Sequence, residues 1–177
     1  MTGEKSNFII RKAGLSDFDH IYDIFTRVLA DGTTYSYAKE EMTPDRSLAY
    51  WMSAPGTHCM VADVGGEVAG MAAIRPNRTG RGDHVANASF IVDEKFRSMG
   101  IARAFGIKAL ALAKRHGYES IQYNYVVSTN DIAVKLWKSL GFEIIGTLPK
   151  GHQHAKLGLV DVFIMHRFLD DIQPADI

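Results

Sequence analysis

The segment 92–103, VDEKFRSMGIAR, combines residue types that suit the binding of a phosphate group. An apolar run ends at its start, a polar turn follows, and a helical pattern begins at Gly100. The first amides of a helix have no acceptor within the helix, and the helix dipole makes that end partly positive. Gly100 and Ala102 leave room for a diphosphate to approach the backbone, and Arg97 and Arg103 add positive charge. The alternative is a glycine at a tight turn that binds no ligand.

The common phosphate-binding motifs with fixed glycine spacing are not present in this segment. A nucleoside-triphosphate loop requires GxxxxGK[ST], and the dinucleotide fingerprint requires GxGxxG. The run 100–105, GIARAF, has only the first glycine of the second pattern. The sequence therefore predicts a phosphate-binding turn of another kind.

The elements that position this segment follow from hydrophobic periodicity and turn residues. A strand over 84–92, a helix over 100–116 and a strand over 120–127 form a βαβ unit, which implies two parallel strands in a mixed sheet. Alternation in the second strand predicts Gln122, Asn124 and Val126 on one face, opposite Ile121, Tyr123, Tyr125 and Val127. The other predicted elements are a strand at 8–12, a helix from a capping box at 16–19 to Gly32, a helix at 45–52, a hairpin of 57–64 and 67–74, a loop at 75–83, a helix ended by Gly141, and strands near 142–148 and 158–168.

Length and composition fit one globular domain over residues 1–177. Apolar residues make up 46% of the chain and charged residues 23%, which is typical of a globular protein. Lysine plus arginine is 20 and aspartate plus glutamate is 20, so the formal net charge is zero. A neutral chain lacks the field that gathers polyanions, which argues against a nucleic-acid partner.

The remaining composition signals concern compartment and metals. The amino terminus, MTGEKSNFII, has no long apolar run, so we expect no signal peptide. No stretch approaches the ~20 apolar residues of a membrane span, and we expect no membrane partner. The lone Cys59 fits a reducing cytoplasm and packing rather than nucleophilic chemistry. His152-x-His154 lacks an evident third ligand nearby, so we expect a mobile loop rather than a metal site.

Two motifs resemble those of the GNAT (GCN5-related N-acetyltransferase) family. Arg97-x-x-Gly100-x-Ala102 resembles its [RQ]xxGx[GA] signature, and a second motif runs from Asn130 through Ala133, Leu136 and Trp137 to Gly141-Phe142. The resemblance covers roughly 8–168. It implies an α/β (α+β) fold with a mixed, mostly antiparallel central sheet, two splayed parallel strands and flanking helices. It also implies acetyl-CoA as cofactor, and family members are often homodimers.

The resemblance assigns the cofactor site residue by residue. Ile91 and Val92 would bond the pantetheine arm, and one of their amides would stabilise the oxyanion. Backbone and side chains of Arg97, Ser98, Met99, Gly100, Ile101, Ala102 and Arg103 would hold the diphosphate. Asn130 would contact the cofactor and assist catalysis. Trp137 stands where the family often has an acidic tyrosine, so we expect Trp137 mainly to pack, and Ser128, Thr129, Asn130 or solvent to stabilise the thiolate.

The acceptor side resembles a narrower subgroup, which includes fungal acetyltransferases of azetidine-2-carboxylate and related proline analogues. The resemblance lies in HVANAS at 84–89, QYNYVVSTN at 122–130, and GTLP at 146–149 with His154. It implies that Asn87 and Asn124 surround the acceptor carboxylate and the reacting centre, although both amides could simply satisfy backbone groups. Tyr35 and His154 would line the same pocket.

These observations predict an acetyl-CoA-dependent N-acetyltransferase that transfers acetyl directly to a small amine, an amino acid or an analogue. One alternative acceptor is a protein amino terminus or lysine. Another alternative is a module that senses acyl-CoA without catalysis, because Trp137 replaces the expected tyrosine.

Overall fold

One sheet organises the protein, whose computed structural model describes residues 7–177. Within those residues the sheet has seven strands in the order β1-β2-β3-β4-β5-β7-β6. The strands are β1 (Ile9–Lys12), β2 (His58–Val64), β3 (Glu67–Pro76), β4 (Val85–Val92), β5 (Ser120–Val127), β6 (Glu143–His154) and β7 (Gly158–Phe168). The start of the chain, where we expect no leader, partly lies outside the described residues.

Four α-helices and several short helical turns connect the strands of the described chain. The helices are α1 (Phe18–Asp31), α2 (Pro44–Leu48), α3 (Ile101–Arg115) and α4 (Asp131–Ser139). The short turns are η1 (Leu15–Asp17), η2 (Lys39–Glu41), η3 (Ala49–Ser53), η4 (Gly80–Gly82) and η5 (Glu94–Phe96). No helix among residues 7–177 has the length and apolar character that crossing a bilayer requires.

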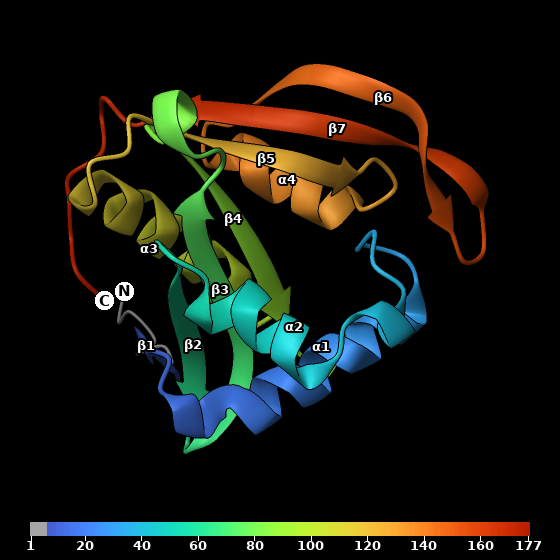
Figure 1. The fold of residues 1–177 in the computed structure, drawn as a ribbon, viewed down its shortest axis with the longest axis horizontal. Helices are drawn as coiled ribbons and strands as arrows, with labels where there is room; N and C mark the ends of the chain where they lie inside the picture. Colours follow the sequence, from blue (N-terminus) through green and yellow to red (C-terminus); the bar gives the residue numbers. More distant parts are fainter. Residues whose placement is uncertain (1–6) are drawn as a thin grey trace, which may run out of the picture.

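The central strands diverge, which is the feature that matters for function. All neighbouring strands pair antiparallel except β4 and β5, which are parallel. The parallel register comprises only Val85 opposite Ser120 and Ala86 opposite Ile121. Beyond these pairs the carboxyl ends of β4 and β5 separate (Figure 1). This confirms the predicted mixed, mostly antiparallel sheet with two splayed parallel strands.

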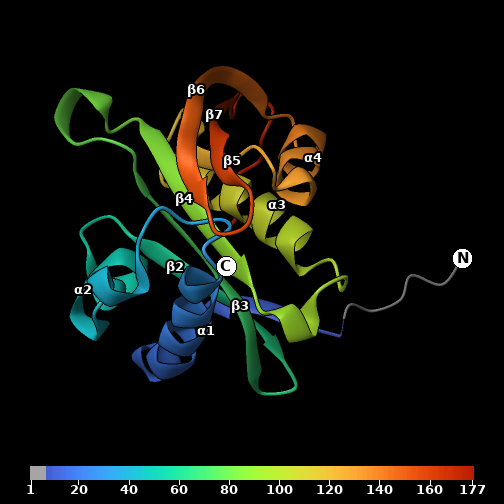
Figure 2. The same ribbon diagram turned by 90° about the vertical axis from the view of Figure 1, so that its right-hand side faces the viewer.

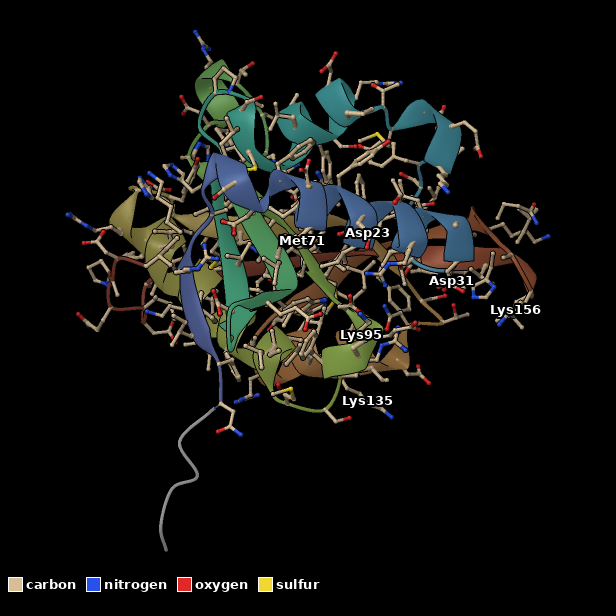
Figure 3. The ribbon with its side chains drawn as sticks, turned by 90° about the horizontal axis from the view of Figure 1, so that it is seen from below. Asp23, Asp31, Met71, Lys95, Lys135 and Lys156 are labelled. Atoms are coloured by element: carbon tan, nitrogen blue, oxygen red, sulfur yellow. The ribbon has the colours of Figure 1, made fainter. Side chains whose placement is uncertain are left out.

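Two apolar cores cover the two faces of the sheet. Helices α1 and α2 lie on one face, and α3 and α4 lie on the other (Figure 2). The α1 core joins Ile21, Ile24 and Phe25, spaced as one helical face, to Met71 of β3, which lies beneath α1 in Figure 3. The α3 core joins Phe105, Ala109 and Leu112 to Ile121, Tyr123 and Trp137. Side chains that leave β4 and β5 therefore point either to the α1 face or to the α3 face.

The structure departs from the predicted elements in three places. The 16–19 capping box does not form, because the Asp17 carboxylate accepts from the Gly14 amide and from Arg11 instead. The helix predicted at 45–52 is α2 followed by the π-helical turn η3. Strand β3 continues to Pro76, so Arg75 belongs to the sheet rather than to a loop.

The clean alternation predicted for β5 is also wrong. Tyr123 pairs with Met165 and Val126 with Phe163, so Asn124 and Tyr125 together lie opposite one residue of β7. This bulge returns Val126 to the α3 core with Tyr123. Bulges redirect side chains, and this one occurs where β5 leaves β4.

Candidate active site

The open edge of β4 presents backbone groups that the sheet does not use. Asn77 N donates to Val85 O, and Asp93 N donates to Ala69 O. Along an antiparallel strand, every second residue forms backbone hydrogen bonds with a given neighbouring strand. On β4 these are residues 85, 87, 89, 91 and 93, which bond to β3. Residues 88, 90 and 92 therefore direct their amides and carbonyls toward the opening.

This alternation corrects one predicted cofactor contact. Ile91 lies opposite Met71 in the bonded register, and its side chain is buried in the α1 core. Its amide and carbonyl therefore serve β3 and do not reach the opening. Val92, the other predicted residue, faces the opening with its backbone, as do Ala88 and Phe90.

The turn before α3 exposes a set of backbone amides. Gly100 has φ 81 and Ser98 has φ 65, both in the left-handed region. The first intrahelical bond is Ala104 N to Gly100 O, so the amides of Ile101, Ala102 and Arg103 have no acceptor within the helix. The first turn of α3 contains no acidic residue that would neutralise the helix dipole.

The same turn is sterically open. A Cβ added to Gly100 would meet nothing within 4 Å. Residues 97–100 are exposed, and Met99 is 37% exposed. Arg103 donates 2.9 Å to Ser139 Oγ at the end of α4, and neither Arg97 nor Arg103 has a carboxylate partner in residues 7–177. The segment can therefore bind a diphosphate with backbone amides and two unpaired guanidinium groups.

An ion pair with α1 fixes the start of this turn. Asp93, which is 4% exposed, accepts from Arg27 Nη2 at 2.7 Å and from the Lys95 amide at 3.1 Å. Burial raises the pKa of Asp93, but the bonds from Arg27 and Lys95 outweigh it and leave the pKa below its usual value. The carboxylate therefore stays charged and holds the end of β4 on α1.

Helix α4 contributes Asn130 and Trp137 in structural contacts. Asn130 Oδ1 accepts from Ala133 N at 3.2 Å and so caps the helix. The Trp137 ring is 7% exposed and packs on Phe90 and Tyr123, with ring centres 4.6 and 4.9 Å away. Trp137 thus packs against both β4 and β5 on the α3 face of the sheet, beside the opening.

Asn124 lies on the α1 face, beside the bulge in β5. Asn124 Nδ2 donates 2.6 Å to Asn77 Oδ1, and Gln122 Nε2 donates 2.8 Å to Asn124 Oδ1. Asn77 follows the last residue of β3. This chain of amides fixes the orientation of Asn124 at the edge of the opening.

Asn87 lies on the same face, on β4. Its side chain is half-buried and makes no hydrogen bond to the described residues. Arg75 lies directly opposite on β3, and Ser89 follows on the same face. The structure therefore places both predicted asparagines on the α1 face, one on each splayed strand.

Aromatic residues from the α1–α2 segment cover this face. Tyr35 donates 3.1 Å to Phe90 O, a carbonyl that faces the opening. Burial raises the pKa of Tyr35 well above its usual value, and Tyr50 raises it further while the charge of Arg75 lowers it. Tyr35 therefore acts here as a neutral hydrogen-bond donor. Tyr37 packs edge-on to Tyr50 at 5.6 Å.

The hairpin β6–β7 closes the end of the face. His152 Nε2 lies 3.3 Å from Gly32 O, and its Nδ1 lies 3.0 Å from Tyr125 Oη. Ala155 N donates to the same carbonyl, and Figure 3 shows Lys156 at the hairpin tip on the side of Asp31. His152 and His154 thus lie on a strand, not on the mobile loop predicted from sequence.

His154 has a local partner in the hairpin. Its Nδ1 accepts from the amides of Lys156 and Leu157 at 3.1 and 3.3 Å, so it caps the β6–β7 turn. These hydrogen bonds tie His154 to the turn. None among the described residues joins it to Asn87 or Asn124. Residues 7–177 contain no group of three histidine, cysteine, aspartate or glutamate side chains able to hold a metal ion together.

Sequence reasoning missed Arg75, Ser89 and Tyr50. Ser89 Oγ lies 2.7 Å from Tyr50 Oη and accepts from Arg75 Nη2 at 3.0 Å. The signal was available in Met71, Ala73 and Arg75, which alternate onto one face, but Pro76 made the segment read as a loop. Two surface hollows of about 510 and 500 Å³ lie elsewhere and are lined by none of the predicted site residues.

Cys59 is buried on β2 and takes no part in this site. Burial raises the pKa of its thiol to about 12, so the thiolate is not populated near neutral pH. This agrees with the predicted packing role.

The fold and motifs of this chain match known acetyltransferases. A solved GCN5-related N-acetyltransferase from Kribbella flavida is 40% identical, with a TM-score of 0.87 over 92% of this chain and 98% of that one. L-amino acid N-acetyltransferase AaaT of Escherichia coli is 28% identical over 148 residues, 82% of this chain and 88% of that protein. N-acetyltransferase aca1 of Schizosaccharomyces pombe is 34% identical over 107 residues, 58% of this chain. The match covers 49% of aca1, so the chain spans about half of that relative's length.

A profile described as the acetyltransferase (GNAT) family matches residues 19–142. That range includes both motifs recognised in the sequence up to Phe142, the opening between β4 and β5, and the turn before α3. The chain belongs to the acetyltransferase (GNAT) family of acyltransferases.

Proposed function

We propose that this protein is an acetyl-CoA-dependent N-acetyltransferase whose acceptor is a small amine, an amino acid or an analogue of one. The observation that carries the proposal is the opening between β4 and β5, which connects the turn before α3 with the asparagine-bearing α1 face. The name of the relative AaaT supports an amino-acid acceptor.

The residues around the opening fit acetyl-CoA. The open space at Gly100 and the unpaired amides of Ile101, Ala102 and Arg103 suit a diphosphate. Backbone groups of Ala88 and Val92 suit an extended arm with amide groups, since they face the opening and pair with no strand there. When bound, acetyl-CoA supplies the thioester carbonyl that the acceptor amine attacks.

The chain's own groups would then perform two tasks. A free β4 amide at the opening donates to the carbonyl oxygen as negative charge develops on it. Asn87 and Asn124 orient the acceptor from the α1 face. The acceptor must arrive as a neutral amine, so its proton passes to solvent or a nearby base before attack.

Trp137 does not supply an acid to the leaving thiolate. An indole N–H donates a hydrogen bond but does not ionise near neutral pH, so it is not a useful acid. Its packing on Phe90 and Tyr123 supports a structural role, with the thiolate taking its proton from solvent. The predicted cytoplasmic location, the single domain over 1–177 and the homodimer stay predictions.

The test is an acceptor screen with the purified protein and acetyl-CoA, which measures thiol release and identifies acetylated products by mass spectrometry. The panel contains free amino acids, proline analogues, polyamines and peptides. Acetylation of free amino acids supports the proposal. Acetylation of peptides alone supports a protein acceptor, and acetyl-CoA binding without thiol release from any acceptor supports the non-catalytic sensor.

A further inference from the structure

The acceptor face contains a guanidinium group without an anionic partner. Arg75 forms no ion pair with any carboxylate in residues 7–177. Its Nη2 donates 3.0 Å to Ser89 Oγ, and its Nε is buried without an acceptor. Its Cζ lies 4.2 Å from the centre of the Tyr50 ring. The aromatic ring and one hydroxyl hold the cation, but they do not neutralise it.

The other partly buried arginines of residues 7–177 have carboxylate partners. Arg11 pairs with Asp17, Arg27 with Asp93, and Arg167 with Asp171. A charge taken out of water is costly unless it is paired and hydrogen-bonded. Arg75 is therefore an exception, and its Nη1 makes no hydrogen bond to the described residues.

Glu41, a carboxylate on the segment that covers this face, already has a hydrogen-bond partner. Burial raises the pKa of Tyr37. Of two smaller electrostatic effects, the charge of Arg75 lowers that pKa and the charge of Glu41 raises it. The Glu41 carboxylate accepts from the Ala38 amide at 2.9 Å and forms no ion pair with Arg75. The protein itself therefore leaves the Arg75 charge available to a ligand.

Arg75 is also correctly placed to act with the asparagines. It lies opposite Asn87 in the bonded register of β3 and β4, where facing side chains are about 5 Å apart at Cβ. Asn77, which holds Asn124, follows two residues later. One ligand could thus contact Arg75 through an anionic group and reach the opening with its amine.

We propose that Arg75 binds the carboxylate of the acceptor, so that the substrate class is amines that carry a carboxylate, such as α-amino acids. The assignment rests on the proposed acetyltransferase function. A planar guanidinium pairs with a carboxylate through two parallel hydrogen bonds, whereas it repels a second ammonium group. Polyamines and amino-acid amides are therefore poor acceptors.

Matched acceptor pairs test the assignment. Alanine, proline and methionine are each compared with the corresponding amide, and kcat/KM is measured by thiol release for the wild type, Arg75→Met and Arg75→Lys. For the best pair we expect the wild type to prefer the acid at least about tenfold. Arg75→Met is expected to lower kcat/KM for the acid roughly 10- to 100-fold, mainly through KM, and for the amide less than about threefold. Arg75→Lys restores part of the preference.

The control is Arg81→Met, which removes an exposed arginine from the η4 turn between the same two strands. It should behave as the wild type. If Arg75 variants do not fold, inhibition of the wild type by N-acetyl amino acids and by their amides gives the same comparison. The acids should inhibit at least about tenfold more strongly.

The outcomes distinguish a failure of the Arg75 assignment from a failure of the proposed acetyltransferase function. Equal loss for acid and amide in Arg75→Met, or a wild type without preference for the acid, overturns the role of Arg75 and leaves the acetyltransferase intact. Failure to acetylate every acid, amide and peptide overturns both.

Discussion

Asn124 of β5 donates a 2.6 Å hydrogen bond from Nδ2 to Oδ1 of Asn77, which follows β3. The bond spans the region where β4 and β5 begin to separate, and Gln122 completes the chain by donating to Asn124 Oδ1. The amide of Asn124 therefore has a fixed orientation before any acceptor binds. Preorganised polar groups are the ones that assist a reaction without further rearrangement.

Asn77→Ala should weaken acceptor use without weakening acetyl-CoA binding. Loss of one hydrogen bond releases the Asn124 amide and should lower kcat/KM for the acceptor about fivefold, equivalent to about 1 kcal/mol. Asn77→Asp retains the accepting oxygen and should stay close to wild type. Steady-state kinetics with the best acceptor and calorimetric binding of acetyl-CoA check this. An equal loss in both variants would contradict the role of the hydrogen bond.

Asn87→Ala should separate function from stability. The Asn87 side chain has no hydrogen-bond partner among residues 7–177, so its removal should change the free energy of unfolding by less than about 0.5 kcal/mol. The acceptor kcat/KM should nevertheless fall at least about fivefold. Ser89→Ala is the comparison, because it loses bonds to Tyr50 and Arg75 and should destabilise the fold by about 1 kcal/mol. Unchanged turnover in Asn87→Ala would remove it from the site.

Gly100→Ala should weaken acetyl-CoA binding by filling the space above the α3 amides. Gly65 in the β2–β3 turn is a matched control, since both glycines have positive φ, 81 and 62, and neither would meet an atom within 4 Å of an added Cβ. Both substitutions should cost about 1 kcal/mol of folding free energy through backbone strain. Only Gly100→Ala should raise the Kd for acetyl-CoA. Equal Kd values in the two variants would argue against a diphosphate at this turn.

Trp137→Phe tests whether Trp137 only packs. The ring contacts to Phe90 and Tyr123 would be partly kept and the indole N–H lost. We expect the folded state to lose roughly 1–3 kcal/mol, measured by urea unfolding, because the smaller ring leaves a gap. The kcat at saturating substrate should stay within about twofold. A drop of a hundredfold in kcat with little loss of stability would instead assign a role to the indole N–H.

Asp17→Asn should change how stability depends on pH. Hydrogen bonds from Arg11, together with the Gly14 amide, lower the pKa of Asp17 below its usual 3.8 in the folded state, against the opposing effect of burial. The unfolded state therefore binds the proton first on acidification, so this contribution is complete above pH 4 and is lost below it. The variant should be about 1–2 kcal/mol less stable at pH 7, and the difference should shrink as the pH falls below 4. Asp19→Asn, an exposed carboxylate in the next turn, is the control, and a constant difference across pH would contradict the assignment.

The sequence predicted the elements that depend on residues close together in the chain. The spacing of Ile21, Ile24 and Phe25 located α1, and the glycine before an apolar run located the turn before α3. The parallel pairing of β4 with β5 followed from the βαβ order. The family resemblance added the splay, which depends on where pairing stops and leaves no periodic signal.

The remaining features depend on contacts between distant segments. His152 sits in a polar stretch that reads as a loop, but Gly32 and Tyr125 fix it on a strand. The bulge at Asn124 leaves no clear signal, because polar and apolar residues alternate up to Tyr125 and the apolar Val126 and Val127 fit either face. Pro76 makes the segment around Arg75 resemble a loop, although both residues belong to β3. That Arg75 lacks a carboxylate partner among residues 7–177 becomes evident only in the folded chain.

The divergence of β4 from β5 also bears on aggregation. Unpaired strand edges at the rim of a sheet can recruit another chain. Here an unpaired edge lies inside the sheet, with β5 on its far side, Tyr35 bonded to one of its carbonyls and α4 behind it. Because this edge is bounded by β4 and β5 of the same sheet, it offers no outer rim along which a strand of a second chain could add. The protein can therefore keep a strand edge ready for its ligand without offering a template for self-association.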